Sequence, residues 1–143
     1  MPDTQCHLAM ARRNQEVIQQ FLDGGNRHPE WLAVVAFYKA LHVVDAVLFA
    51  DNPARHGGSH HNREHILKTT ARYQHIFKHY RPLYAASLVG RYLEFNHNQF
   101  TCFADYMAPD FVVNTLLSHH LRQVERSAEM IIGPLGAKEP TTP

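Results

Sequence analysis

The chain has 143 residues, the size of a single domain, and 45% of them are hydrophobic while 19% are charged. These proportions exclude disordered, collagen-like and low-complexity proteins. Fourteen Lys and Arg residues against 13 Asp and Glu leave a net charge of only +1. The 12 histidines are the unusual feature, because unperturbed imidazoles titrate near pH ~6.5 and would raise the net charge toward +13 in mild acid.

Cysteine spacing and the N-terminal residues indicate a cytoplasmic protein. Cys6 and Cys102 lie far apart and outside any C-x-x-C pattern, so neither a disulfide framework nor a cysteine zinc site is expected. Charged residues occupy the N-terminal region where a signal peptide needs an apolar stretch. Residues 31–50 are strongly apolar, but three polar residues in their middle favour a buried bundle helix over a membrane span.

Apolar residues recur at helical spacing along most of the chain, which predicts an all-α fold. We expect one domain over residues 1–132, a mostly antiparallel bundle of four to five helices, followed by a disordered tail over 133–143. The first helix is predicted from Thr4 to Asp23, where Gly24 and Gly25 stop it, and the second from Pro29 to about Ala50.

A third helix is predicted from the capping residue Ser59 to about Tyr80. Pro82 is expected to break or kink the chain and to start a fourth, shorter helix through Val89. No element is predicted for residues 96–108. The last helix, Pro109 to Ile132, has the most regular apolar period in the sequence.

The second helix carries a polar stripe in an otherwise apolar sequence. Tyr38, His42 and Asp45 fall on one side of it. A His and an Asp three residues apart can form a hydrogen bond, in which the carboxylate fixes the imidazole tautomer or raises its basicity. The alternative is a structural polar pair inside the core that performs no chemistry.

A second group of histidines lies at the start of the third helix. His60 and His61 occupy its first turn, where the helix dipole disfavours an imidazolium and so favours the neutral form that a base or a metal ligand needs. His61 and His65 are four residues apart and could share a divalent metal, zinc or nickel, as could His75 and His79. The alternative is a solvated, histidine-rich helix start.

Positive charge is concentrated in one stretch of the chain. Residues 52–91 contain seven Lys and Arg residues against one acid, a net +6, while the remainder carries −5. Six of the 12 histidines lie in the same stretch. This segregation predicts a docking side for phosphates or another anion, although a solvated helix face is an alternative.

The chain resembles a bacterial branch of the HEPN superfamily over about residues 31–132. Three segments carry the resemblance: Phe37-Tyr38-x-Ala40-Leu41-His42-x-x-Asp45-Ala46, the loop His56-x-x-Ser59-His60-x-x-Arg63, and Gly90-Arg91-Tyr92. The resemblance implies a small helical bundle, often a homodimer. Many members are metal-independent endoribonucleases of toxin–antitoxin or defence systems, and others are non-catalytic partners of nucleotidyltransferases.

The family's catalytic signature is an Arg followed by four to six residues and a His. Arg91 and His97 have this form, and we favour them because they lie late in the bundle, after Gly90. Three other pairs also have the spacing: Arg55 with His60, Arg55 with His61, and Arg72 with His79. The resemblance therefore implies that Arg91 and His97 are catalytic.

Together these observations define a candidate site and three functional hypotheses. The catalytic candidates are Arg91, His97, His42 and Asp45, and the substrate-binding candidates are Tyr38, His60, Arg63 and Tyr92. The first hypothesis is a HEPN-like domain that binds RNA or a nucleotide without a cofactor, as a homodimer or with an antitoxin or nucleotidyltransferase partner. The second is a non-catalytic interaction or dimerisation module. The third is a bundle that binds a divalent metal, zinc or nickel, through His61 and His65, with His42, Asp45 and His60 as further ligands.

Overall fold

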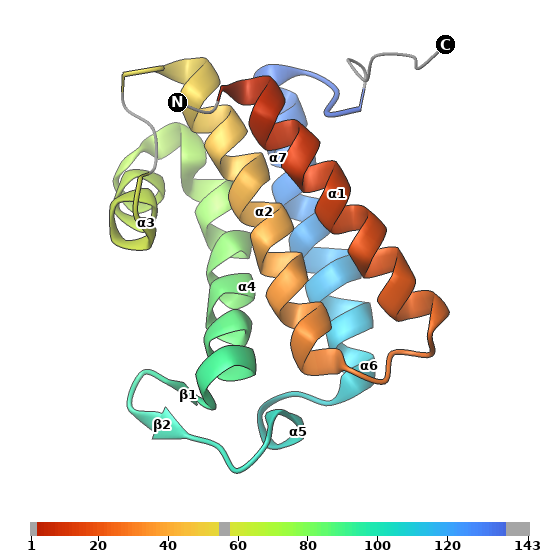
Figure 1. Cartoon of the computed structure of the whole chain (residues 1–143). Coiled ribbons are helices and arrows are strands. Elements are labelled where there is room, and N and C mark those ends of the chain that lie inside the picture. The colour runs from red at the N-terminus through yellow and green to blue at the C-terminus, as the bar shows by residue number, and fades with distance from the viewer. Residues whose placement is uncertain (1–2, 55–57, 137–143) are drawn as a thin grey trace.

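The computed structural model describes residues 3–54 and 58–136 and shows an all-α bundle. Helix α1 (Thr4–Asp23), helix α2 (Pro29–Asp51), helix α4 (Gln74–Tyr92) and a last helical rod pack side by side (Figure 1). Helix α2 contacts each of the other three long segments. The predicted all-α bundle is therefore confirmed, and its core is built around α2.

Helix α1 has the predicted bounds because both of its ends are locally encoded. The Asp3 carboxylate accepts a hydrogen bond from the Cys6 backbone N–H at 2.9 Å and caps the first turn. At the other end the backbone N–H of Gly24 bonds to the Gln20 carbonyl. Gly25 then turns the chain with a φ of 87°, a left-handed conformation that favours glycine.

Helix α2 is the central helix and is buried on nearly every face. Among the described residues it is the one helix long and apolar enough to cross a membrane, and 72% of its most apolar window lies inside the bundle. The core helix of a soluble domain has this property. Its few polar residues, Lys39 and Asp45 among them, are therefore held inside the protein and must find partners there.

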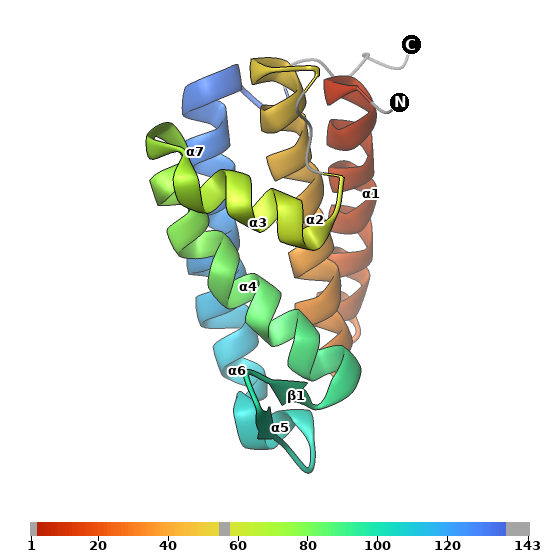
Figure 2. The ribbon, with the colours of Figure 1, turned by 90° about the vertical axis from the view of Figure 1, so that its left-hand side faces the viewer.

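The segment after the first loop differs from the sequence prediction. Helix α3 (His60–Thr69) ends 11 residues before Tyr80, and the short helix η1 (Ala71–Tyr73) connects it to α4. Side chains of the turn satisfy the end of α3: Thr69 Oγ1 donates to the His65 carbonyl at 2.7 Å, and Gln74 Nε2 donates to the Lys68 carbonyl at 2.8 Å. The chain then turns, so that α3 lies across the bundle (Figure 2).

Helix α4 runs without interruption through Pro82, where the sequence predicts a break or kink and the start of a separate helix. Proline removes one backbone hydrogen bond, but Leu83, Ala86 and Val89 beyond it are fully buried against the rest of the core. Gly90 also lets α4 approach α2 closely, since a Cβ at this position would lie 2.9 Å from the Glu30 carbonyl oxygen. Packing against α2 therefore decides the course of α4.

A small hairpin follows α4, where no element is predicted. Strands β1 (Glu94–Phe95) and β2 (Asn98–Gln99) pair antiparallel around Asn96 and His97. These two turn residues have φ values of 52° and 68°, the left-handed pair that a two-residue hairpin requires. The short helix α5 (Phe103–Tyr106) then leads into the last rod.

The last rod confirms the helix predicted from Pro109 to Ile132, but its middle is wound differently. It consists of α6 (Pro109–Phe111), the π-helix η2 (Val112–Leu121) and α7 (Arg122–Ile132). Ser118 Oγ donates to the Val113 carbonyl, five residues earlier, at 2.9 Å. A ten-residue π-helix is unusual, because most π-helical segments are single turns. Such segments often lie at functional sites.

Parts of two sequence predictions lie outside the described residues. Arg55, His56 and Gly57 belong to the histidine-rich loop, and residues 137–143 make up most of the tail that is predicted to be disordered. Residues 133–136 are described, and Leu135 packs on the core.

Candidate functional site

A buried ion pair joins α2 to α3. Arg63 Nε donates to one oxygen of Asp45 at 2.7 Å, and Arg63 Nη2 donates to the other at 2.9 Å. Both side chains are less than a tenth exposed. The expected hydrogen bond between His42 and Asp45 is thus replaced by a bidentate pair with Arg63, because a planar guanidinium matches both carboxylate oxygens.

His60 lies beside this ion pair, on the first turn of α3. The helix begins as predicted, since Ser59 Oγ accepts a hydrogen bond from the Asn62 backbone N–H at 3.1 Å. The His60 ring contacts the rings of Phe37 and Tyr84, with centroids 5.8 and 5.6 Å away. Burial lowers the pKa of His60, and the positive charges of Arg63 and then Arg91 lower it further. His60 is therefore a neutral imidazole at pH 7.

Arg91 extends from the last turn of α4 back toward α2. Its Nε donates to the Ser87 carbonyl at 3.2 Å, its Nη2 to Ser87 Oγ at 3.3 Å and its Nη1 to Tyr38 Oη at 3.2 Å. These acceptors are neutral, and within the described residues no carboxylate forms an ion pair with Arg91. The half-buried guanidinium therefore keeps an unbalanced positive charge.

Two tyrosines flank this guanidinium. The Arg91 Cζ atom lies 5.7 Å from the ring centroid of Tyr38 and 5.1 Å from that of Tyr92. Both distances suit cation–π attraction. Tyr92 is 62% exposed, so its ring also offers a free aromatic surface to solvent.

His42 turns toward α1 instead of the Asp45 carboxylate. Its Nδ1 lies 3.1 Å from Nδ1 of His7, a hydrogen-bond distance. Burial lowers the pKa of His42, and the neighbouring His7 lowers it further. The sequence expectation that Asp45 raises the basicity of His42 is thus overturned by desolvation, which outweighs the attraction of the carboxylate.

Arg91 and His97, the pair with the catalytic spacing, have different surroundings in the structure. His97 is exposed in the hairpin turn and lines a hollow of about 330 Å³ with Leu88 and Tyr92. Arg91 instead bonds to Ser87 and Tyr38, and it is not among the residues that line this hollow. In the part of the chain that the structure describes, no hydrogen bond or ring contact joins Arg91 to His97.

The histidine pair proposed for a metal from sequence, His61 and His65, is exposed on α3. Residues 3–54 and 58–136 bring no third histidine, cysteine or carboxylate to this pair. Two ligands are too few for a protein metal site, which usually takes three or four. The described structure instead gathers a different set of histidines.

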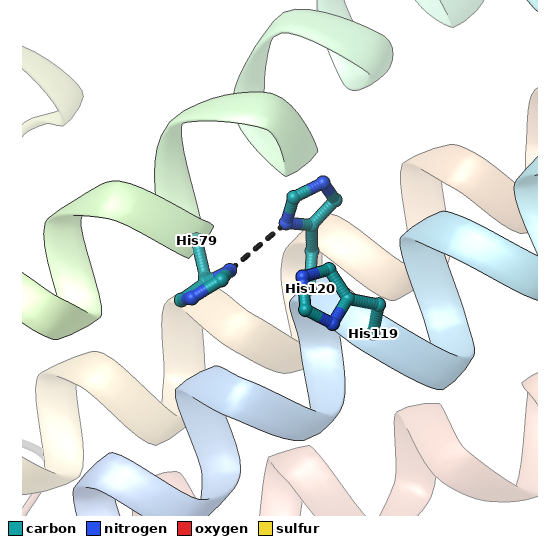
Figure 3. Close-up of side chains that lie close together, drawn as sticks. All are labelled: His79, His119 and His120. Carbon is teal, nitrogen blue, oxygen red and sulfur yellow. Dashed lines mark hydrogen bonds between the residues drawn. The ribbon is translucent and has the colours of Figure 1, made fainter.

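This set lies between α4 and the π-helix η2. His79, His119 and His120 each offer a ring nitrogen, and the three nitrogen atoms lie within 4.8 Å of one another (Figure 3). His79 Nδ1 is 3.0 Å from His120 Nδ1, and the His119 ring meets the His79 ring edge to face at 5.1 Å. These residues could hold a metal ion. We call His79, His119 and His120 the histidine cluster.

His75 stands at the edge of the histidine cluster. Its ring centroid is 4.9 Å from that of His79, one turn away on α4, and its Nε2 is 3.2 Å from Oε1 of Gln123 on α7. Burial, together with the nearby His120, His75 and His119, lowers the pKa of His79 to about 4. Burial and His119 also lower the pKa of His120. Both imidazoles are neutral at pH 7.

The sequence identifies only one of the three residues of the histidine cluster, His79. The spacing of His75 and His79 marks them as neighbours on one helix, whereas His119 and His120 are adjacent and would diverge by about 100° in an α-helix. The wider winding of η2 reduces that divergence. The sequence does contain one indication that His120 faces the rest of the bundle. His120 lies beside Leu121 and Val124, on the apolar stripe that faces the core.

Part of the predicted positive stretch is neutralised by acids of α2. Arg63 is paired with Asp45, and Arg72 Nη2 lies 3.3 Å from Oδ1 of Asp51. Arg91 is different, because its partners are neutral.

Comparison of the chain with models of protein families, with curated proteins and with solved structures finds no match. The site geometry therefore carries the functional argument.

Proposed function

We propose that this chain is a HEPN-like domain that binds the phosphate groups of RNA or of a nucleotide at Arg91. The observation that carries the proposal is the half-buried guanidinium of Arg91, whose described partners are all neutral. Desolvation makes an unbalanced charge costly, so a guanidinium held in this way favours an anionic ligand. The resemblance to HEPN domains at Gly90-Arg91-Tyr92 agrees with this assignment.

The donor geometry of Arg91 suits a phosphate. A guanidinium has five N–H donors, and the contacts to Ser87 and Tyr38 engage three of them. One N–H remains on each terminal nitrogen, the arrangement that allows two bonds to one phosphate group. The two bonds to Ser87 fix the direction of the side chain, so little entropy is lost when the ligand binds.

The aromatic rings around Arg91 supply a surface for a base. Tyr92 is exposed next to the guanidinium, and Trp31, seven residues before Tyr38 and hence on the same side of α2, is 52% exposed. Single-stranded nucleic acids bind by stacking bases on such rings while arginines hold the phosphates. This combination favours RNA or a nucleotide over a simple inorganic anion.

His60 supports a cleavage step. It is neutral at pH 7, and the Arg91 charge is near enough to lower its pKa. A neutral imidazole can accept the proton of a ribose 2′-hydroxyl while an adjacent guanidinium stabilises the charge on the phosphate. We therefore assign the role of general base to His60 in place of His97, which has no contact with Arg91 among the described residues.

Binding is tested with a fluorescein-labelled single-stranded RNA in an anisotropy titration over several salt concentrations. Arg91→Gln is expected to weaken binding at least about tenfold and to reduce the slope of log Kd against log salt by about one. Arg81→Gln is the matched control, because Arg81 is exposed on the same helix and the change in charge is identical. Equal effects of the two substitutions would contradict the proposal.

Cleavage is tested on the same RNA with EDTA present. His60→Ala is expected to reduce the cleavage rate at least about 100-fold, the contribution of a general base, and to change RNA affinity little. His97→Ala should leave the rate unchanged. Loss of cleavage in His97→Ala but not in His60→Ala would overturn the assignment of the base, while leaving the binding result intact.

A further inference from the structure

We propose that His79, His119 and His120 bind a divalent transition-metal ion, with Zn²⁺ as the preferred ion, between α4 and η2. The three ring nitrogen atoms lie within 4.8 Å of one another and come from two elements that the fold holds together. Imidazole nitrogen is a ligand that suits Zn²⁺, whereas Mg²⁺ and Ca²⁺ prefer oxygen. This site is independent of the function proposed for Arg91.

The distances are close to those of a metal site. Two nitrogens bound to one tetrahedral Zn²⁺ at about 2.0–2.1 Å lie about 3.3 Å apart. His79 Nδ1 and His120 Nδ1, 3.0 Å apart, already have nearly this separation, and Figure 3 shows them pointing toward each other. The third nitrogen, from His119, needs to move by up to about 1.5 Å, which a rotation of this exposed ring supplies.

The surroundings also fit a metal site. His79 is buried while His119 is exposed, so the histidine cluster is anchored on one side and open to solvent on the other. An ion can enter from the open side, and a water molecule can take the fourth position. His75 stands next to His79 and is oriented by Gln123, as a residue supporting the ligand shell would be.

The π-helix is a second and independent observation at the same place. His119 and His120 are in η2, which runs from Val112 to Leu121 and reverts to an α-helix at Arg122. A π-helix is rare, and its occurrences frequently lie at functional sites. Here the wider winding brings two adjacent histidines to one side chain of α4, which an α-helix does less well.

The histidine cluster is separate from the Arg91 site. His79 and Arg91 are both on α4, and their separation of 12 positions corresponds to about 18 Å along the helix axis. A metal ion held by the histidine cluster therefore does not touch the groups around Arg91. Zinc at this position ties α4 to η2 and leaves RNA binding unaffected.

The test is equilibrium dialysis of the untagged 143-residue chain against Zn²⁺, with the bound metal measured by mass spectrometry. We expect one equivalent of Zn²⁺ per chain. His119→Ala removes an exposed ligand and is expected to weaken Zn²⁺ binding at least about tenfold, while the folded state persists. The matched control is the double variant His61→Ala/His65→Ala, which removes two exposed histidines outside the cluster and should retain the equivalent.

Co²⁺ provides a second measurement that reports coordination directly. The visible absorption of Co²⁺ bound to the wild-type chain is expected to be intense, as for a four-coordinate ion, and to be lost in His119→Ala. Failure of the wild-type chain to retain Zn²⁺ would overturn the proposal. Retention of the full equivalent by His119→Ala, or its loss in His61→Ala/His65→Ala, would also overturn it.

Discussion

Arg63 holds both carboxylate oxygens of Asp45 from a helix that crosses the bundle, at 2.7 and 2.9 Å, and thereby attaches α3 to α2. Both charges are buried. The attraction between the two charges offsets their loss of hydration. If one partner is removed, the buried charge of the other is left without compensation.

Asp45→Leu is accordingly expected to lower the free energy of unfolding by about 3–5 kcal/mol, because the Arg63 charge remains buried without its partner. The double variant Asp45→Leu/Arg63→Met replaces the pair by apolar groups and should be clearly more stable than the single variant. Urea unfolding monitored by circular dichroism measures both. A double variant that is less stable than Asp45→Leu would contradict this account of the pair.

The close approach of α4 to α2 predicts the effect of a methyl group at Gly90. Alanine usually favours a helix over glycine by about 1 kcal/mol, yet a Cβ here would lie 2.9 Å from the Glu30 carbonyl oxygen and 3.0 Å from Val34 Cγ2. Backbone cannot move aside cheaply, so Gly90→Ala is expected to destabilise the fold by about 1–3 kcal/mol in thermal unfolding. Gly136→Ala, where no atom lies within 4 Å, should be neutral.

Pro82 inside α4 predicts a stabilising substitution. Proline in a helix interior costs about 3 kcal/mol relative to alanine, because one hydrogen bond is lost and the ring crowds the preceding turn. Part of this cost is offset by the restriction of the unfolded chain. Pro82→Ala is therefore expected to raise the free energy of unfolding by about 1–2 kcal/mol. If the free energy of unfolding measured in urea falls instead, the proline ring contributes essential packing.

The low pKa of His79 predicts how stability changes with pH in EDTA. Burial and the facing imidazoles of His119, His120 and His75, with Lys78, lower the pKa of His79 from 6.5 to about 4. Between these pH values the unfolded chain binds a proton that the folded chain does not, so the free energy of unfolding falls as pH falls.

The expected loss is at most about 3 kcal/mol between pH 6.5 and 4, with no further contribution of His79 below pH 4. Urea unfolding at a series of pH values measures it, and His79→Asn should flatten the curve, whereas exposed His61→Asn should not. If the free energy of unfolding depends on pH in the same way in wild type and His79→Asn, the attribution of the pH dependence to His79 is wrong.

The sequence predicts those helices whose limits are set by nearby residues. The caps Asp3 and Ser59, the stop at Gly24 and the start at Pro29 act through local hydrogen bonds and backbone conformation. The turn between α3 and α4 depends instead on Gln74 reaching back to the Lys68 carbonyl, and the passage through Pro82 depends on burial against α2. Propensity alone does not encode these tertiary effects.

The candidate site follows the same division. The spacing of Tyr38, His42 and Asp45 predicts one polar stripe on α2. In the structure their hydrogen-bond partners come from three other helices, α4, α1 and α3 respectively, and only the fold brings those partners near. His120 lies next to His79 because α4 packs against η2 and because η2 is wound as a π-helix. Periodicity describes one helix at a time and cannot identify contacts between helices.

The burial of α2 on all sides has a consequence for biosynthesis. Ribosomes make the chain from its N-terminus at about 5–20 residues per second, so a finished α2 waits several seconds for α4 and α7, which cover it in the native bundle. During that interval the nascent chain presents a 23-residue apolar helix that, among the elements of the bundle, only α1 can cover. Chaperones that bind exposed apolar segments therefore have their main target in residues 29–51.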